Sequence, residues 1–261
     1  MKELYASEIT DPSLKELETF AKWYNDKIGN YPVIVGGWAV YCYTKGLGSK
    51  DIDVVFPGDA SKHATLFAYF AQHGYVERSR DFFDKEFVKP VKSKGRDVEI
   101  IIDAVSANRT IIFEGKEARL PWSWAAKYNV EHKLGNAKIY IPTIELLLVY
   151  KLGAILGRSY NLRTGIDFDY YKSKLWKDVY DVVSLSKLKV DIAKVNDFLD
   201  KSSLSQYKEE IETVIEDNFD RELGSLLGDV AFSNVDEILQ LSGRRPPRIP
   251  FRIPKRLGGK V

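Results

Sequence analysis

Two aspartates separated by a single residue, Asp51 and Asp53, are the side chains in this sequence best placed to do chemistry. They belong to the stretch DIDVVF, which reads as a β-strand, so both carboxylates project from one face while Ile52, Val54 and Phe56 point into the core. Each of two carboxylates this close raises the pKa of the other unless a cation lies between them. Mg²⁺ commonly binds one or two carboxylates together with water and substrate phosphates. The pair therefore predicts a divalent metal site, with Mg²⁺ or Mn²⁺ as the cofactor.

Two glycines, Gly36 and Gly37, precede the aspartates and follow the short apolar run VIV. Glycine lets the backbone come close to a ligand because it has no Cβ. If a helix begins at these glycines and runs through residues 38–43, its free N–H groups and the positive end of its dipole face a bound anion. A triphosphate held at the glycines and a metal held at the aspartates meet the requirement for phosphoryl or nucleotidyl transfer. The alternative is structural: a tight turn followed by a solvated or N-capping aspartate pair.

A third acidic ligand is expected on a neighbouring strand. Residues 84–88 and 98–105 read as paired strands joined by the basic loop 89–96. One face of the second strand is wholly apolar, so Glu99 and Asp103 share the other. Asp103, at the end of the strand after three isoleucines, fits the third ligand best, and Glu99 is the reserve candidate. The alternative is an exposed edge carboxylate.

The order Gly-Gly, spacer, Asp-x-Asp resembles the signature of the nucleotidyltransferase superfamily, the enzymes with a DNA polymerase β-like fold, in which the spacer is about ten residues. The resemblance implies a mixed sheet in an α/β (α+β) core. It also implies that Asp51, Asp53 and Asp103 hold the metal and that Asp103 acts as general base on the attacking hydroxyl. Gly36 and Gly37 would hold the β and γ phosphates, although glycine at the second position replaces the more frequent serine.

Two later motifs add to this resemblance. Lys151 lies on the apolar face of a predicted helix and either extends toward solvent or meets an anion. Asp178 borders the buried stripe of a later helix, where a purely structural salt bridge is the alternative. The segments KLGA, beginning at Lys151, and KDVYDV, containing Asp178, resemble elements found in the abortive-infection toxins and related nucleotidyltransferases of bacteria and archaea. This resemblance implies that Lys151 contacts nucleotide phosphates and that Asp178 is a catalytic or substrate-orienting carboxylate.

The elements that position these motifs fall into two groups. Strands and helices alternate up to about residue 142, and the later periodicity is helical. Helices are expected over residues 11–28, 61–73, 143–156, 173–185, 191–201, 207–217 and 233–241, with a hairpin over 109–119 and a last strand over 139–142. We therefore predict a nucleotidyltransferase α/β core over residues 1–142 and a helical C-terminal domain over residues 143–242.

The last segment, residues 243–261, has seven Lys or Arg, four prolines and no acidic residue. Such a composition predicts an extended tail rather than a regular element. Its charge suits contact with a phosphate backbone. The alternatives are a solubilising tail and a strap across the acidic helices of the protein itself.

The composition is that of an ordinary globular protein: 261 residues, of which 44% are hydrophobic and 29% charged. The net charge of +2 is too small to indicate a nucleic-acid partner by itself. The single cysteine, Cys42, excludes an internal disulfide and fits a reducing compartment. The sequence contains no apolar stretch of membrane-spanning length and no signal peptide, so a cytoplasmic protein without membrane contact is expected.

Together the motifs predict transfer of a nucleoside monophosphate from an NTP to an acceptor hydroxyl, with release of pyrophosphate. RNA, a protein and a small molecule are all compatible acceptors, and the sequence leaves the NTP base and the oligomeric state open. One alternative is a catalytically silent member of the fold that binds nucleotide or RNA. Another is a partner-binding component of a toxin-antitoxin-like pair, in which the acidic residues are only solvated.

Overall fold

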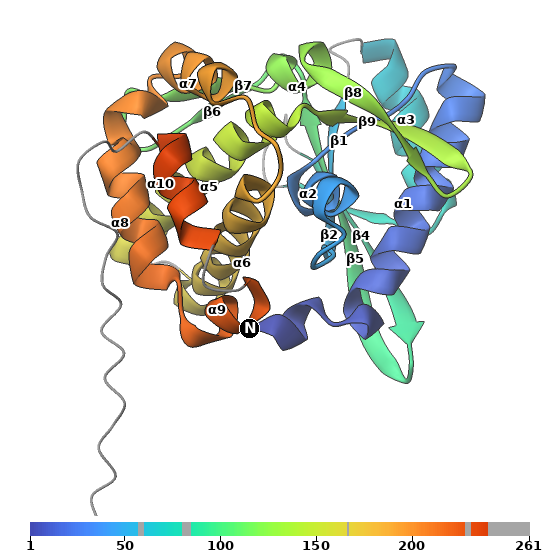
Figure 1. The fold of residues 1–261 in the computed structure, drawn as a ribbon. Helices are drawn as coiled ribbons and strands as arrows, with labels where there is room; N and C mark the ends of the chain where they lie inside the picture. Colours follow the sequence, from blue (N-terminus) through green and yellow to red (C-terminus); the bar gives the residue numbers. More distant parts are fainter. Residues whose placement is uncertain (57–59, 80–84, 166, 228–230, 240–261) are drawn as a thin grey trace, which may run out of the picture.

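A seven-stranded mixed sheet lies at the centre of the computed structural model, which describes residues 1–56, 60–79, 85–165, 167–227 and 231–239 (Figure 1). The strands lie in the order β3-β4-β5-β2-β1-β9-β8. Their bounds are β1 (Val33–Val35), β2 (Asp51–Phe56), β3 (Val76–Ser79), β4 (Lys85–Ser93), β5 (Arg96–Ser106), β8 (Asn129–Leu134) and β9 (Ala137–Pro142). The expected α/β class with a mixed sheet is therefore confirmed.

The two strands that carry the predicted acidic residues are neighbours in the sheet. β2 and β5 run parallel, and Asp53 lies directly opposite Asp103 in the register. Parallel neighbours need a crossover connection, which here contains α3 (Ala60–Gln72), β3 and β4. β1 lies on the other side of β2 and runs antiparallel to it, with its last residue, Val35, opposite Asp53. This register holds the following residue, Gly36, beside the acidic face of β2.

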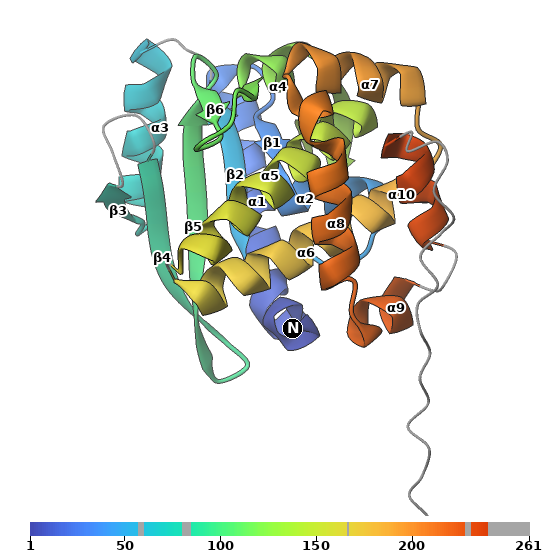
Figure 2. The same ribbon diagram turned by 90° about the vertical axis from the view of Figure 1, so that its left-hand side faces the viewer.

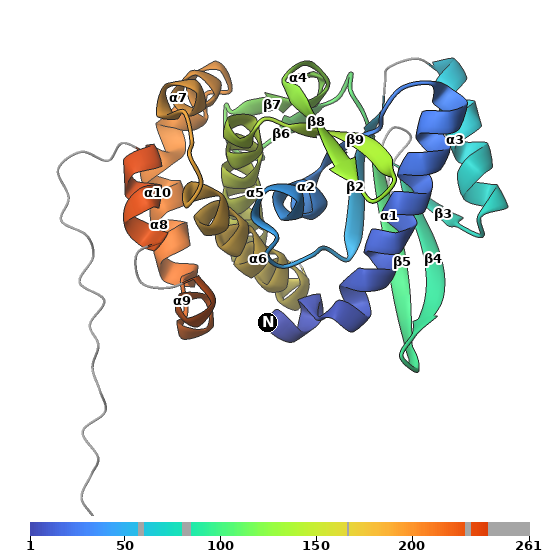
Figure 3. The ribbon, with the colours of Figure 1, turned by 45° about the vertical axis from the view of Figure 1, so that its right-hand side comes forward.

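Helices α1 (Ser7–Ile28) and α3 pack together on one side of the sheet, and Figure 3 shows them side by side. α1 buries Leu17, Phe20 and Tyr24, which recur at helical spacing. Phe20 packs on Phe70 of α3, with 5.7 Å between the ring centroids. The sequence predicts both helices, although α1 begins at Ser7 rather than at residue 11.

The chain from Ile144 onward is helical within the described residues, and β4, β5 and β2 lie between α3 and these helices (Figure 2). The helices are α5 (Ile144–Thr164), α6 (Phe168–Ser186), α7 (Ile192–Lys201), α8 (Lys208–Asn218), α9 (Arg221–Leu227) and α10 (Ala231–Leu239), with a short 3₁₀ turn at Leu204–Tyr207. A second 3₁₀ turn, Lys2–Tyr5, precedes α1 at the other end of the chain. α2 (Gly36–Thr44) lies between the sheet and α5 and α6, and it buries Trp38, Ala39 and Val40. α2 thus links the sheet to the helical part.

The β4–β5 hairpin is longer than the sequence predicts. β4 continues to Ser93 and β5 begins at Arg96, so the expected loop 89–96 shrinks to a two-residue turn. Lys94 and Gly95 have φ angles of 47° and 81°, and a two-residue hairpin turn of this kind requires positive φ at both positions. Four of the seven extra strand residues next to the turn are charged and one is Pro90, which is why the segment reads as a loop.

α5 also exceeds its predicted length. It continues to Thr164 instead of ending at residue 156, although Gly153 and Gly157 lie inside it. A Cβ at Gly153 would lie 2.7 Å from Leu120 Cδ1, so this glycine allows close packing rather than ending the helix.

Short and polar elements account for most of the other differences. β3, β8 and α9 are not predicted, because β3 and β8 are edge strands of mainly exposed residues and α9 is short. The predicted hairpin forms as β6 (Thr110–Ile112) and β7 (Arg119–Pro121), which α4 (Ser123–Lys127) follows.

The predicted basic tail, residues 243–261, lies outside the described residues. No helix in the described part of the chain is long and apolar enough to cross a membrane.

Candidate active site

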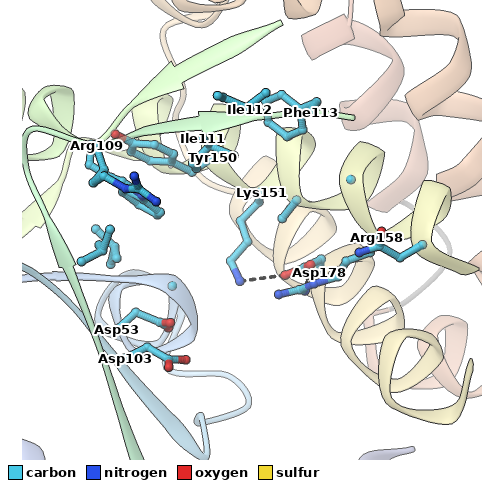
Figure 4. A pocket seen from close by; sticks show the side chains of 18 of the residues that line it. Asp53, Asp103, Arg109, Ile111, Ile112, Phe113, Tyr150, Lys151, Arg158 and Asp178 are labelled. Atoms are coloured by element: carbon cyan, nitrogen blue, oxygen red, sulfur yellow. Dashed lines mark hydrogen bonds and ion pairs between the residues drawn. The ribbon is translucent and has the colours of Figure 1, made fainter. Parts of the chain in front are cut away.

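A row of three carboxylates crosses neighbouring strands of the sheet. Asp53 on β2 lies opposite Asp103 on β5, and Asp103 lies opposite Glu86 on β4. Residues that are paired in register project from the same face, and all three line one cavity. In Figure 4 the carboxylates of Asp53 and Asp103 lie side by side. The structure therefore brings together two of the three predicted metal ligands and adds Glu86, which the sequence motifs do not single out.

The reserve candidate, Glu99, lies elsewhere. It shares a face of β5 with Asp103 but is exposed, and its carboxylate pairs with Arg78, with 2.8 Å between Oε1 and Nη2. Glu99 is not among the residues that line the cavity. It offers a matched control for Asp103 because both carboxylates project from the same face of the same strand.

The cavity has a volume of about 1110 Å³ and lies between the acidic face of the sheet and helices α5 and α6. Lys151 and Arg158 of α5 and Asp178 of α6 line the wall across from Asp53 and Asp103 (Figure 4). The rest of the wall is largely apolar and aromatic and includes Ile111, Ile112, Phe113, Trp122, Tyr150, Tyr160 and Tyr170. One end of the cavity thus suits a charged ligand, and its other walls suit an apolar or planar one.

Gly36 occupies a position that requires glycine for two separate reasons. Its φ angle is 64°, and a Cβ there would lie 1.8 Å from Asp53 Oδ2. α2 begins at Gly36, as predicted, and Gly36 lines the cavity. A Cβ at Gly37 would instead lie 2.7 Å from the hydroxyl oxygen of Ser49, and Gly37 is not part of the cavity wall. Of the two predicted phosphate-binding glycines, Gly36 therefore faces the cavity together with the acidic residues.

Replacing Gly36 with alanine is expected to destabilise the protein and to displace the Asp53 carboxylate. The left-handed backbone conformation alone costs a non-glycine residue about 1–3 kcal/mol. Gly29 is a matched control, since its φ angle is 72° and a Cβ there meets nothing within 4 Å. We expect Gly36→Ala to lower the free energy of unfolding in urea by more than Gly29→Ala does. Equal losses of unfolding free energy in the two variants would show that the Asp53 carboxylate does not clash with a Cβ at position 36.

Asp51 has a different environment from Asp53. It is buried and forms an ion pair with Lys174 of α6. Burial alone would lower the pKa of Lys174, but the Asp51 carboxylate, together with Tyr170 and Tyr5, outweighs it and raises this pKa to about 12. Burial raises the pKa of Asp53, and the nearby Asp51 carboxylate adds to the rise. Lys174 thus neutralises Asp51, the first of the two aspartates. Asp51 does not line the cavity, whereas Asp53 does.

A buried network of charges joins α5 to α6. Lys151 Nζ lies 2.9 Å from Asp178 Oδ1 and 2.7 Å from Asp181 Oδ2. Asp178 also pairs with Arg158, and Asp181 also pairs with Lys177, one helical turn away. Lys151 therefore meets carboxylates of the protein itself. The structural salt bridge that is the alternative for Asp178 and its helix is present. Lys151, Arg158 and Asp178 nevertheless line the cavity, so a ligand there would lie against this network.

Arg158 lines the cavity and Lys174 pairs with Asp51 behind it, although neither residue lies in a predicted motif. Arg158 follows Lys151 by two helical turns and so shares its face, a relation hidden by the early predicted end of α5. Lys174 precedes Lys177 by one turn of α6. Its pairing with Asp51 has no signal in the sequence, because the two residues are 123 positions apart.

A hard divalent cation such as Mg²⁺ needs oxygen ligands. Among the described residues, no group of three or more His, Cys, Asp or Glu side chains is placed to hold a metal ion. Asp53 and Asp103 offer oxygen ligands from neighbouring strands to the same cavity. Mg²⁺ typically takes one or two carboxylates and completes its shell with water and substrate phosphates. The two carboxylates therefore fit a metal that arrives with a phosphorylated ligand.

Comparisons with known proteins identify no family for this chain. The chain matches no protein-family model and no curated protein. Among solved structures it is similar to an antigenic nucleotidyltransferase-like protein from Paracoccidioides brasiliensis, with 14% identity, a TM-score of 0.46, and coverage of 80% of this chain and 94% of that chain. It is also similar to JHP933 from Helicobacter pylori, with 15% identity, a TM-score of 0.49, and coverage of 89% of this chain and 90% of that chain. These distant likenesses identify neither an activity nor a substrate.

Proposed function

We propose that the protein is a metal-dependent nucleotidyltransferase that moves a nucleoside monophosphate from an NTP to an acceptor hydroxyl. The observation that carries this proposal is the placement of Asp53, Asp103 and Gly36 on one wall of the cavity. Two carboxylates and the beginning of a helix are complementary to a metal ion and to a phosphate chain, respectively. Lys151 and Arg158 on the facing wall add positive charge for the same ligand.

In this mechanism Asp53 and Asp103 would hold Mg²⁺ or Mn²⁺, which, when bound, neutralises charge that develops on the phosphates. The acceptor oxygen forms a bond to the α-phosphorus, and the bond between that phosphorus and the pyrophosphate oxygen breaks. Asp103 accepts the proton of the acceptor hydroxyl. Gly36 contributes free backbone N–H at the beginning of α2, and Lys151 and Arg158 orient the phosphates. Positioning and electrostatics supply most of the rate in transfers of this kind.

The test is incubation with each α-³²P-labelled NTP and Mg²⁺, with and without total RNA, followed by separation of RNA, protein and small molecules. Label that moves to one of these fractions, and does so far less with Asp53→Asn, supports the proposal and identifies the acceptor class. No transfer of label from any NTP to any fraction would count against it.

The ion pair between Asp51 and Lys174 favours a second candidate, a catalytically silent protein that binds nucleotide in the same cavity. In that case one acidic residue of the site is permanently neutralised by the protein itself. Equilibrium dialysis separates the two candidates: NTP binding that depends on Asp53, without transfer of label to any acceptor, supports the silent protein.

A further inference from the structure

Lys174 connects α6 to the acidic strand β2. Its ammonium group pairs with the Asp51 carboxylate, and Asp51 precedes Asp53 by two residues on the same strand. The ammonium group also lies 5.5 Å from the ring centroid of Tyr170, which lines the cavity one helical turn earlier on α6. Lys174 thus lies between a buried carboxylate and the cavity wall.

The burial of Lys174 distinguishes it from the lysines of the network between α5 and α6. Its side chain is 22% exposed, compared with 9% for Lys151 and 5% for Lys177. A lysine has a flexible four-carbon stem and three donors, so a partly exposed one can move its charge without unpacking a helix. Lys151 and Lys177 are each held by carboxylates that are almost completely buried.

We propose that Lys174 is the counter-ion of Asp51 in the ligand-free protein and becomes a ligand of the triphosphate when a metal–NTP complex enters the cavity. This inference rests on the proposed function and adds a positioning residue to it. Asp51 projects from the same face of β2 as Asp53, so a divalent cation held by Asp53 and Asp103 at the cavity wall would lie next to the Asp51 carboxylate. The ammonium group and this cation would then compete for Asp51, because both cannot bind the same oxygen lone pairs. The arriving phosphates offer the displaced ammonium group a new anionic partner. Lys174 therefore lowers the affinity for the metal alone and raises the affinity for the triphosphate.

The first test measures Mn²⁺ binding without nucleotide, by electron paramagnetic resonance of the free ion. Lys174→Met keeps the apolar stem and removes the charge, and it is expected to bind Mn²⁺ about tenfold more tightly, as close charge pairs have coupling energies of that order or more. Lys172→Met is the matched control, because Lys172 is exposed on the same helix and its ammonium group lies over the Phe168 ring rather than against Asp51. Its Mn²⁺ affinity should equal that of the wild type.

The second test measures binding of inorganic tripolyphosphate in the presence of Mg²⁺, which probes the phosphate site whatever the base. Lys174→Met should bind it about fivefold or more weakly than the wild type, since a hydrogen bond to a charged group is lost. Stronger metal binding together with weaker phosphate binding is not expected of a salt bridge that only stabilises the fold.

A double-mutant cycle tests whether the change in Mn²⁺ affinity comes from the ion pair between Lys174 and Asp51. In an Asp51→Asn background, Lys174→Met should leave the Mn²⁺ affinity unchanged. If Lys174→Met does not fold, Lys174→Arg takes its place. Its guanidinium group binds a carboxylate through two hydrogen bonds, and it should therefore weaken Mn²⁺ binding relative to the wild type.

The outcomes separate the two proposals. Unchanged Mn²⁺ and tripolyphosphate affinities in Lys174→Met, together with loss of both in Asp53→Asn, would overturn the role of Lys174 and leave the proposed function standing. Absence of Mn²⁺ and tripolyphosphate binding in the wild-type protein would overturn both.

Discussion

Asparagine in place of Asp53 or Asp103 is expected to lower the rate of nucleotidyl transfer about a thousandfold, because each change removes charge from the site that stabilises the transition state. The two residues lie opposite each other on parallel strands and face the same cavity. Asparagine has nearly the same size and keeps one oxygen, so the loss reports charge rather than shape. The measurement is the initial rate of label transfer at saturating NTP and Mg²⁺.

Glu99→Gln provides the control on the same face of β5. Glu99 pairs with Arg78 at the surface and does not line the cavity, so its replacement should leave the transfer rate within about a factor of two. A comparable loss of activity in Glu99→Gln and Asp103→Asn would contradict the assignment of Asp103 to the site.

Stability measurements separate loss of activity from loss of folding. Burial raises the pKa of Asp53, with a further contribution from Asp51, so the charged form of Asp53 is disfavoured in the folded protein. Between the ordinary pKa of about 3.9 and the raised value, the folded protein binds more protons than the unfolded chain, and stability falls as the pH rises. Asp53→Asn removes this dependence. Its free energy of unfolding relative to the wild type should therefore increase from pH 4 to pH 7, and a decrease would contradict this account.

Removal of Asp181 should have the largest effect on stability. This carboxylate is completely buried and pairs with both Lys151 and Lys177. Burial lowers the pKa of Lys177 to about 8 even though Asp181 acts in the opposite direction. Asp181→Ala leaves both lysines buried without this carboxylate, and breaking a buried ion pair in this way typically costs about 3–5 kcal/mol. Denaturation in urea at pH 7 measures the loss.

The exposed pair Lys201–Asp197 is a matched control, since it has the same i, i+4 spacing but half-exposed side chains. Asp197→Ala should leave the free energy of unfolding nearly unchanged, because solvent screens surface ion pairs. Similar losses in the two variants would mean that the Asp181 pairs are screened by water and do not form a buried network.

The local elements around the motifs could be predicted from the sequence by itself. The apolar run that ends at Val35, the helix that begins at Gly36 and the strand that carries Asp51 and Asp53 all occur where the sequence predicts them. The reason is that these elements depend on near neighbours: alternation with a period of two, an apolar helix and glycines at its beginning. The same reasoning predicts a hairpin that ends in an acidic strand, including Asp103.

Pairing between distant elements was decided by the tertiary structure. The register that aligns Glu86, Asp103 and Asp53 depends on which strands become neighbours, and alternation within a strand does not contain this information. The packing of α5 and α6 against the sheet brings Lys174 to Asp51, and the packing of α5 on α6 brings Lys151 to Asp178. The sequence determined which charged groups are available, whereas long-range packing determined their partners, because the strength of an ion pair depends on distance and burial that only the assembled fold provides.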